Sequence, residues 1–591
     1  MNKISVPVLI VGGGGAGLTS SMLLSTLGVD SMLVSALPHT SLLPKAHVLN
    51  QRAMEIFEEV GVADEIYRKS TPTENMKAVG WYAGVTGNHD GYGRCLGKLE
   101  AWGGGYTDPD YIAASPCRTS NLPQIRLEPV LKAHAEKLNG NVRFGHELVS
   151  LTQDEDGVTA QIRNNATKEE YEVWAQYFLG CDGGRIVGKQ VGIKIENQHE
   201  LKMRMVSTHL SYDFSKYLPD PDVLIRWMVN PDFGSSWASG VLVSMGPDHW
   251  GNASEEWVFH LHFAFDDDDA FDDAKVIERM RMTTGIPDFN PDIHYISRWV
   301  MEGVLADKFR VGRVFAVGDA AHRHPPTGGL GLTSAVHDAY NLCWKLAAVL
   351  KGHASDALLD TYEAERRPVD ANNVNCSVGN AMNHFTIDRA LNISAEKTPE
   401  ENWAELRPLW ENLPKSAEKR HNLNRAIGSQ TMEFRHHNVE FGYSYNSKAI
   451  IDDGSPAYIP LDPIRLYEPS TKPGHPLPHA WVEREGERVA LGTLVHGGYF
   501  LLIAGEEGQD WIRAAQHIAK EQMLLVRAVT VGVLGSDYVD VRCSWLKNRA
   551  ISGKGAVLVR PDRYIAYRSI GEVENPLMVL RQVFGQILAQ S

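Results

Sequence analysis

Past its middle the chain carries the run Val317-Gly318-Asp319-Ala320-Ala321-His322-Arg323-His324-Pro325-Pro326-Thr327-Gly328-Gly329-Leu330-Gly331-Leu332. An apolar run of strand length, 313–317, precedes it, so Asp319 follows the carboxyl end of a predicted strand, where α/β folds collect ligands. Apolar residues then recur at three- and four-residue spacing, which predicts a helix from near Gly331. The glycines let backbone N–H groups approach a ligand, and the helix start adds positive partial charge. The run therefore predicts a site for an anion, with a tight turn capped by Asp319 as the alternative.

A second glycine cluster lies near the amino terminus. Residues 8–11 read as a buried strand, and the following Gly12, Gly14 and Gly17 fit the pattern GxGxxG. A predicted helix at 18–27 and a strand at 31–34 complete a βαβ unit, the context in which this pattern indicates dinucleotide binding. The acidic residue expected at the end of the second strand is replaced by Ser35, which offers the ribose a single weaker hydrogen bond.

With Gly180-Cys181-Asp182-Gly183-Gly184-Arg185 between them, the two glycine clusters resemble those of the group A flavoprotein aromatic hydroxylases. The resemblance runs over nearly the whole chain and is strongest to the phenol hydroxylase branch. Residues 47–55, 124–128 and 558–564 carry that closer match. It implies an α/β fold with a glutathione-reductase-like FAD-binding domain, an inserted β-sheet substrate domain and a C-terminal thioredoxin-like domain.

The resemblance also implies which residues bind the cofactor FAD. These are Gly12, Gly14, Gly17, Ser35, Lys45, Arg52, Gln124, Asp182, Asp319, Pro326, Gly328, Gly331 and Leu332. Two positions depart from the family pattern: Ile186 stands where a serine is usual, and Thr333 where an asparagine is usual. Each departure removes one expected polar contact near the cofactor.

The candidate catalytic base is His47. In the phenol hydroxylase branch an ionisable group that helps to deprotonate the phenol occurs in this segment, and counting back from Arg52 places it at His47. A histidine titrates near neutrality and can accept a phenolic proton directly or through water. The alternative is a histidine that only satisfies loop hydrogen bonds.

Residues of a predicted substrate sheet supply candidates for the pocket wall. Residues 195–300 alternate with period two, as in 257–263, which predicts a sheet with one face toward the substrate. We select Trp227, Met228, Trp237 and His249 as pocket residues. Aromatic residues on a sheet are more often plain core, and that alternative stays open for each of them.

Composition excludes several classes of protein. A chain of 591 residues is too long to fold around a single hydrophobic core, so we expect more than one domain. Its formal charge of −15 and the lack of a basic stripe argue against a nucleic-acid partner. Six cysteines lie scattered without CxxC pairs, and no metal site is expected. Because a strand begins within a few residues of Met1 and no apolar run reaches membrane-spanning length, we expect a cytoplasmic protein that does not enter a membrane.

The expected domains are discontinuous. Residues 1–70, 115–190 and 300–385 form the FAD-binding domain, while 71–114 and 191–299 form the substrate domain. A helical connector covers 386–441. Residues 442–591 form the thioredoxin-like domain, which lacks CxxC and therefore has no expected redox role.

The expected function follows from the resemblance and from the presence of one dinucleotide fingerprint. The chain would be a monooxygenase that binds NADPH or NADH transiently, reduces FAD and, with O2, hydroxylates a chlorophenol-like phenol at the ortho carbon through a flavin C4a-hydroperoxide. The resemblance also implies a homo-oligomer, either a dimer or a dimer of dimers. Two alternatives stay open: a flavin oxidase or dehydrogenase on the same fold, and a non-catalytic FAD-binding protein.

Overall fold

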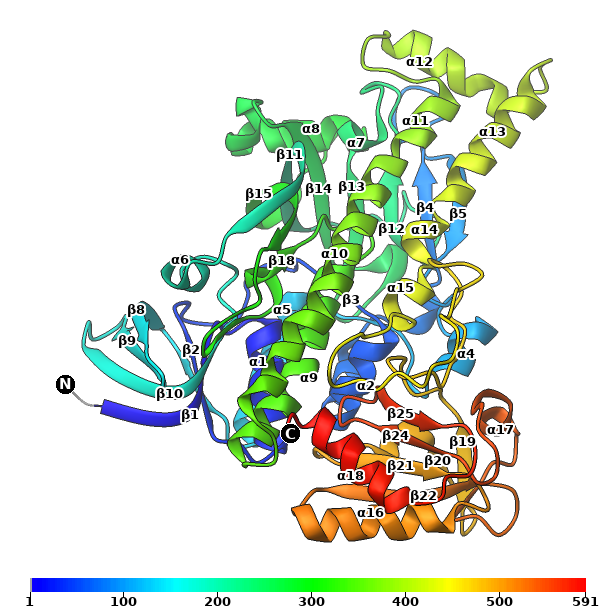
Figure 1. The fold of residues 1–591 in the computed structure, drawn as a ribbon. Helices are drawn as coiled ribbons and strands as arrows, with labels where there is room; N and C mark the ends of the chain where they lie inside the picture. Colours follow the sequence, from blue (N-terminus) through cyan, green and yellow to red (C-terminus); the bar gives the residue numbers. More distant parts are fainter. Residues whose placement is uncertain (1–2, 591) are drawn as a thin grey trace.

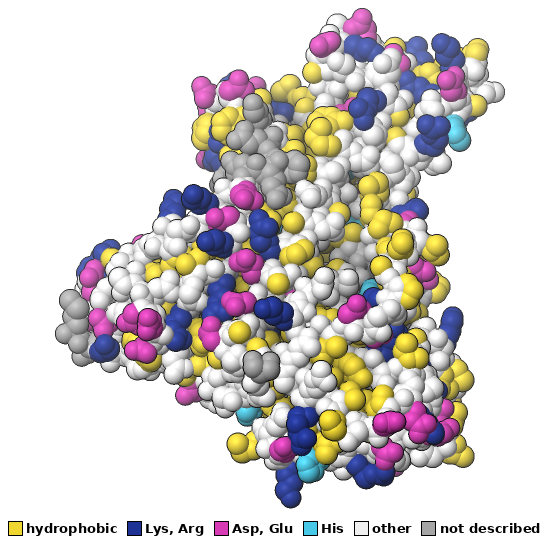
Figure 2. All heavy atoms as spheres, in the orientation of Figure 1, with side chains coloured by type: hydrophobic (Ala, Val, Ile, Leu, Met, Phe, Trp, Pro, Cys, Tyr) yellow, Lys and Arg dark blue, Asp and Glu magenta, His cyan; other side chains and the backbone are white. Residues whose placement is uncertain are grey.

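The computed structural model describes residues 3–590, apart from the side chains of residues 197–200 and 202. Three large β-sheets and the helices packed on them form three lobes (Figure 1). Acidic and basic side chains are interspersed over the face drawn in Figure 2. No helix within residues 3–590 is both long enough and apolar enough to cross a bilayer.

The first sheet holds the amino-terminal strand at its centre. Its main path is β16 (Arg310–Val311), β17 (Val314–Ala316), β10 (Glu170–Gly180), β1 (Lys3–Val11), β2 (Ser31–Ser35) and β7 (Asn141–Phe144). Strand β1 is parallel to both β10 and β2, and its apolar residues pair with apolar residues of both neighbours. Helices α1 (Gly15–Thr26), α5 (Gln124–Lys137) and α9 (Leu330–Leu350) share the core of this lobe. The hairpin of β8 (His146–Gln153) and β9 (Val158–Asn164) extends β10.

The second sheet is mixed and combines distant parts of the chain. Its order is β18 (His322–Arg323), β15 (Asp292–Ala306), β11 (Ile195–Ser211), β14 (Glu256–Ala264), β13 (Val241–Gly246), β12 (Val223–Met228), β4 (Ala78–Tyr82) and β5 (Cys95–Glu100). Successive side chains of β14 point to opposite faces of the sheet, so the strand packs in two different clusters. Trp257, Phe259 and Leu261 pack in the cluster that includes α8 (Asp273–Thr284). Val258 packs on the other face, in a cluster that also contains Val48 from the first lobe.

A helical segment joins the lobes. The long helix α10 (Asp360–Asn383) runs from the first lobe to the second sheet (Figure 1). It is followed by α11 (Phe385–Leu391), α12 (Pro399–Leu406), α13 (Ser416–Ser429), α14 (Thr431–Phe434) and α15 (His437–Phe441). Apolar residues of α10 to α14 complete the cluster that holds Val48 and Val258.

The third sheet lies in the C-terminal lobe. Its order is β20 (Glu487–Ala490), β19 (Trp481–Arg484), β23 (Tyr538–Val539), β22 (Val526–Gly532), β21 (Phe500–Ala504), β24 (Ala556–Val559) and β25 (Ile565–Ser569). Strands β21 and β22 are parallel, whereas β21 with β24 and β24 with β25 are antiparallel. Helices α16 (Gln509–Gln522) and α18 (Pro576–Ile587) lie side by side against it (Figure 1).

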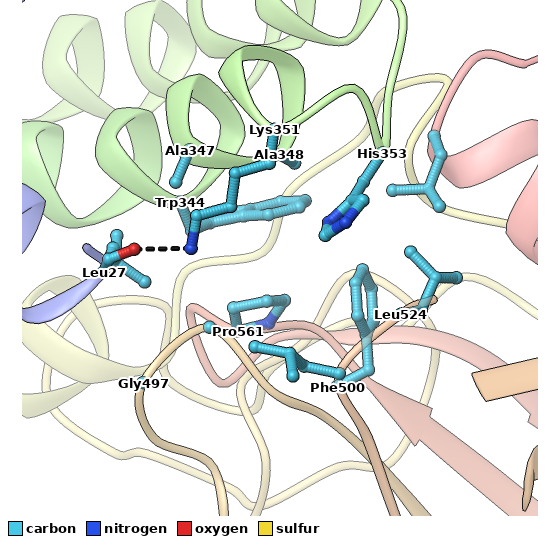
Figure 3. Close-up of a pocket in the computed structure, with 13 residues that line it drawn as sticks. Leu27, Trp344, Ala347, Ala348, Lys351, His353, Gly497, Phe500, Leu524 and Pro561 are labelled. Atoms are coloured by element: carbon cyan, nitrogen blue, oxygen red, sulfur yellow. Dashed lines mark hydrogen bonds between the residues drawn. The ribbon is translucent and has the colours of Figure 1, made fainter. Parts of the chain in front are cut away.

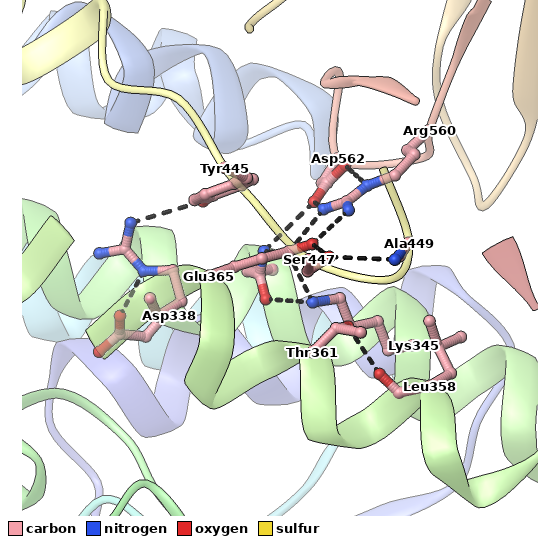
Figure 4. Close-up of polar contacts among 12 residues, drawn as sticks. Asp338, Lys345, Leu358, Thr361, Glu365, Tyr445, Ser447, Ala449, Arg560 and Asp562 are labelled. Carbon is pink, nitrogen blue, oxygen red and sulfur yellow. Dashed lines mark hydrogen bonds and ion pairs between the residues drawn. The ribbon is translucent and has the colours of Figure 1, made fainter. Parts of the chain in front are cut away.

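Buried ion pairs connect the C-terminal lobe to the first lobe. Arg560 donates to both carboxylate oxygens of Glu365 on α10, at 2.6 and 2.9 Å, and Lys345 on α9 donates to the same carboxylate at 2.7 Å (Figure 4). All three side chains are fully buried. Burial lowers the pKa of Lys345 to about 8, although Glu365 opposes the shift. Breaking one such buried pair leaves the partner charge uncompensated, so this contact fixes how the two lobes meet.

A small cavity of about 40 Å³ lies at the contact between the first lobe and the C-terminal lobe. It is lined by side chains of α9, including Trp344, and of the C-terminal lobe, including Phe500 and Pro561 (Figure 3). Lys351 crosses one edge and donates to the Leu27 carbonyl at 2.6 Å. The cavity has room for about one water molecule and is too small for an aromatic ligand.

Candidate functional site

The two glycine turns predicted from the sequence meet in space. A Cβ atom built on Gly318 would lie 2.9 Å from the Ala335 Cβ and 3.2 Å from the Ala16 Cβ. A Cβ built on Gly15 would lie 2.6 Å from Leu332 Cδ1. The first turns of α1 and α9 are therefore in contact. Because each helix start carries positive partial charge, the two starts create one electropositive region.

The amino-terminal turn is held by close backbone contacts. Gly12 has a φ of +121°, and a Cβ there would lie 2.0 Å from the carbonyl O of Cys181. A Cβ on Gly17 would lie 1.9 Å from the carbonyl O of Gly12. Gly14 is different, because a Cβ built there would have only one atom within 4 Å, Glu128 Oε1 at 3.6 Å. Gly14 caps α1 without a side-chain hydrogen bond, so the first N–H groups of α1 are available to an anion such as a pyrophosphate.

The second turn, Gly328 to Leu332, leaves polar groups without partners. Gly329, with a φ of +65°, caps α9 and offers no side chain to its N–H groups. Within the described residues neither ring nitrogen of His324 has a hydrogen-bond partner, and Asn380 Nδ2 also has none. Asn380 Nδ2 would lie 3.2 Å from a Cβ on Gly328, and His324 Nδ1 3.7 Å from one on Gly331. These unpaired atoms lie beside the glycine backbone and would pair with the polar edge of a ligand, which fits the pyrimidine part of a flavin.

A buried charge cluster holds the Gly318 turn, which precedes the second turn in the same glycine-rich run. The Asp338 carboxylate accepts from the backbone N of Gly318 at 3.0 Å, from His322 Nε2 at 2.7 Å and from Arg366 Nε at 2.7 Å (Figure 4 shows Asp338). Burial would lower the pKa of His322, but Asp370 and Asp338 raise it to about 9. Burial together with the neighbouring Asp338 raises the pKa of Asp370 to about 7, against the opposing effect of Arg366. His322 and Arg366 are therefore the charged partners that hold Asp338, and with it the Gly318 turn, in place.

His47 lies beside the second turn with one ring nitrogen fixed. Its Nδ1 is 2.6 Å from Asn121 Oδ1, and Asn121 Nδ2 donates to Thr71 Oγ1 at 2.6 Å. The pairing of β3 (Val48–Leu49) with β6 (Ser120–Asn121) sets this geometry. The next residue, Val48, would be 3.4 Å from a Cβ on Gly329. Burial lowers the pKa of His47, with the Asn121 bond opposing, so the ring is neutral at pH 7.

The sheet face that carries Val258 also carries a second histidine. His260 on β14 lies on the same face as Val258, which shares a cluster with Val48. Its Nδ1 is 2.8 Å from Ser207 Oγ on β11. Burial and the nearby His47 together lower the pKa of His260 to about 3. We did not select His260 from the sequence, although the alternation in 257–263 places it on one face with Val258.

The four predicted pocket residues are dispersed. Trp227 and Trp237 are buried in contact with each other, and Trp227 stacks on His384 at 3.8 Å. Met228 packs in the cluster that includes α8, on the opposite face of the sheet, because alternation turns it away from its neighbour. His249 is 72% exposed and pairs with Glu255. The structure therefore brings neither Met228 nor His249 to His47.

Several predicted cofactor residues lie at the glycine turns. Ser35 ends β2 beside Gly13, where an added Cβ would be 3.0 Å from the Ser35 Cβ. Asp319 is exposed in the turn after β17, and Pro326 is exposed just before Gly328. Leu332 contacts the first turn of α1, as described above. The Thr333 hydroxyl donates to the Leu330 carbonyl at 3.0 Å and so stabilises the start of α9.

The remaining predicted cofactor residues make contacts within the protein. Asp182 accepts from the backbone N of Gly184, Ile186 and Val187, so it caps α6 (Val187–Val191), and Ile186 contributes through its backbone. Gln124 donates to Glu128 at 2.6 Å, and Lys45 is exposed. The buried Arg52 pairs with Glu55 and lies 4.2 Å from the Phe441 ring centre. These contacts leave the predicted cofactor role of each residue untested.

Sequence reasoning missed Asn121 and Asp338 as well as His260. Asn121 sits just before the helix that carries Gln124, and nothing in the sequence connects it with His47, 74 positions away. Asp338 follows the glycine-rich run on the buried side of α9. A carboxylate at a buried helical position is a usable signal, because it must find a charged partner.

Comparisons with known proteins agree with this geometry. The FAD binding domain family matches residues 5–377, and the aromatic-ring hydroxylase C-terminal family matches residues 470–587. The chain is 34% identical to 2,4-dichlorophenol 6-monooxygenase of Delftia acidovorans, covering 99% of this chain and 98% of the relative. It is 32% identical to phenol 2-monooxygenase of Pseudomonas sp. (strain EST1001), covering 98% and 93%.

A solved structure is similar over the full length. The flavin-dependent monooxygenase PieE, in complex with FAD and substrate, superposes with a TM-score of 0.91 at 36% identity, and each chain is covered completely. The glycine turns with their unpaired polar groups fit FAD, and the FAD binding domain match covers both turns. The chain therefore belongs to the FAD-dependent aromatic-ring hydroxylases, in the phenol hydroxylase branch, and is a flavoprotein monooxygenase.

Proposed function

We propose that this enzyme uses NADPH or NADH and O2 to hydroxylate a chlorophenol-like phenol at the carbon next to its hydroxyl group. The observation that carries the proposal is His47, a neutral histidine with one nitrogen fixed, beside the turn that fits the flavin. The two relatives named above are called a 6- and a 2-monooxygenase of phenols, and both positions are ortho to the hydroxyl.

The hydrogen bonds of Asn121 define which nitrogen of His47 acts. Because Asn121 Nδ2 donates to Thr71, its Oδ1 faces His47 and must accept. Nδ1 of His47 therefore carries the hydrogen, and Nε2 has a free lone pair. A phenol bound at Nε2 would give up its proton there, which raises electron density at the ortho carbon.

The glycine turns would hold the cofactor. The start of α1 at Gly14 would bind the pyrophosphate, while the start of α9 would stabilise negative charge on the ring. Bound FAD would supply hydride acceptance from NAD(P)H and the activation of O2. The protein residues orient the ring, exclude water from it and move the phenolic proton.

We further propose the domain architecture of the glutathione-reductase-like hydroxylases. The parallel β10-β1-β2 core with α1 crossing from β1 to β2 supports the FAD-binding domain. The β22-β21-β24-β25 order with α16 and α18 supports a thioredoxin-like C-terminal domain. The homo-oligomer and the cytoplasmic location stay predictions.

The oxidase or dehydrogenase alternative makes a different stoichiometric prediction. A hydroxylase consumes NAD(P)H and O2 together and forms a hydroxylated product, whereas an oxidase forms only hydrogen peroxide. We expect one product molecule per NAD(P)H with 2,4-dichlorophenol in a panel of phenols. Formation of one hydrogen peroxide from O2 for each NAD(P)H oxidised, without hydroxylated product for any phenol in the panel, would contradict the proposal.

Substitution of His47 tests the mechanism. We expect His47→Ala to lower the hydroxylation rate by about 100-fold, because the phenol loses its base, while FAD content is unchanged. In the wild type the rate should fall as pH decreases through the lowered pKa of His47, since protonation removes the lone pair. This acidic limb should vanish in the variant.

His39 offers a matched control, because it is an exposed histidine in the same loop. His39→Ala should retain both the rate and the pH profile. A His47→Ala enzyme with wild-type turnover at every pH would remove His47 from the mechanism.

A further inference from the structure

His260 presents a hydrogen-bond donor on the sheet face that holds Val258, and the proposed function does not use it. Strand β14 pairs His260 with Ser207 on β11 and with Val241 on β13, so its backbone is fixed from both sides. Val258, two residues earlier on the same face, belongs to the cluster that contains Val48. Val241, the cross-strand partner of His260, belongs to the same cluster, so the face of β14 that carries His260 borders the cluster of Val48, the residue after His47.

A chain of hydrogen bonds defines the tautomer of His260. Trp299 Nε1 donates to Ser207 Oγ at 3.2 Å, and Ser207 Oγ is 2.8 Å from His260 Nδ1. Indole can only donate, so Ser207 Oγ accepts from Trp299. Among the described residues His260 Nδ1 is the one acceptor paired with the serine hydroxyl, so we take the serine hydrogen to be directed there. Nδ1 then accepts, and Nε2 carries the hydrogen. Among the described residues none forms a hydrogen bond with Nε2.

The two tautomers make His47 and His260 complementary as acceptor and donor. His47 offers a free lone pair and His260 a free N–H group. Burial keeps His260 neutral, and of the titratable groups near it His47 and His262 also have pKa values lowered by burial. A donor that stays neutral stabilises a developing anion without repelling the proton that moves to His47.

We propose that His260 is a second catalytic residue, whose Nε2–H donates to the oxygen of the phenolate formed when His47 removes the phenolic proton. In this step the phenol O–H bond breaks, its electron pair stays on oxygen, and an N–H bond forms at His47 Nε2. The hydrogen bond from His260 stabilises the charged oxygen and fixes which ring carbon faces the flavin. The inference rests on the proposed function, because it requires a phenolic substrate at His47.

The ionisation of a bound phenol tests this role without turnover. The holoenzyme is titrated with 4-nitrophenol, whose phenolate absorbs visible light, and the pKa of the bound phenol is read from the absorbance against pH. We expect His260→Leu to raise this bound-phenol pKa by about one unit relative to the wild type, because one hydrogen bond to the anion is lost. His260→Gln keeps an N–H donor near the same position and should recover most of the shift.

Turnover adds an independent readout. His260→Leu should lower kcat by about tenfold or more and change KM less, because the hydrogen bond from His260 strengthens as negative charge develops on the phenol oxygen. His294→Gln, an exposed histidine on β15 of the same sheet, should leave both the bound-phenol pKa and kcat unchanged. If His260→Leu does not fold, Ser207→Ala takes its place, since it removes the group that fixes the tautomer and should give a smaller shift in the same direction.

The possible failures are distinguishable. An FAD-loaded His260→Leu enzyme with the wild-type bound-phenol pKa would overturn the role of His260 and leave the proposed function intact. A wild-type holoenzyme that binds no phenol and forms no hydroxylated product would overturn the proposed function, and this inference with it.

Discussion

The amino-terminal glycine turn and the turn at Gly328 to Leu332 use the same residue type for opposite reasons. At Gly12 and Gly17 an added Cβ would lie about 2 Å from a backbone carbonyl of the protein itself. At Gly328, Gly329 and Gly331 the nearest atoms are side-chain atoms 3.2 to 3.7 Å away. The first turn is closed by its own packing, whereas the second leaves space. We infer that Gly12 and Gly17 shape the fold, while Gly14 and the second set of glycines leave the backbone open to the ligand.

The largest expected effect comes from Gly17→Ala, which tests the closed turn. Its methyl group would lie 1.9 Å from the Gly12 carbonyl, so the strand and helix must separate. We expect a loss of about 4 kcal/mol or more in the free energy of unfolding, and protein without bound flavin. Thermal unfolding and the flavin absorption band measure both. Gly428→Ala on α13, where no atom lies within 4 Å, is the control and should behave as wild type. A yellow, stable Gly17→Ala protein would contradict the closed-turn interpretation.

Asp338→Asn examines what holds the Gly318 turn, which precedes the open turn in the same glycine-rich run. Asparagine removes the negative charge that pairs with the buried Arg366 and His322. It also weakens the hydrogen bond from the Gly318 N–H. We expect a loss of about 3 kcal/mol in the free energy of unfolding, measured by chemical denaturation. Asp360→Asn at the exposed start of α10 provides the comparison, and it should cost far less. Equal effects of the two substitutions would show that the buried cluster does not support the turn.

The smallest effect on stability is expected for Gly331→Ala. A methyl group there meets only His324 Nδ1 at 3.7 Å, so the melting temperature should stay within a few degrees of wild type. We expect FAD affinity to fall by about tenfold, or about 1.4 kcal/mol, because the methyl occupies space that the ring would use. Equilibrium dialysis of FAD reports the affinity. Gly379→Ala on α10 has no atom within 4 Å and should alter neither quantity. Unchanged FAD affinity in Gly331→Ala would remove the distinction between the two turns.

The fold could be anticipated in detail where local patterns are strong. The start of α9 within one residue of Gly331, the β1-α1-β2 unit and the hairpin around 154–157 all follow from periodicity and turn residues. The pocket was harder to predict. Trp227 and Met228 are adjacent in sequence and both apolar, yet alternation places them on opposite faces, and only the location of Val48 and α8 defines which face is which.

The sequence alone determined that two glycine clusters and one βαβ unit would serve a dinucleotide, because turn geometry and helix periodicity are local properties of the chain. It also pointed to His47. The tertiary structure alone decided that Asn121 fixes the His47 tautomer, that Asp338 holds the Gly318 turn and that the sheet face carrying Val258 and His260 joins the cluster of Val48. These relations join residues far apart in the chain, and hydrogen bonds and charge interactions depend on distances that only the packed fold defines.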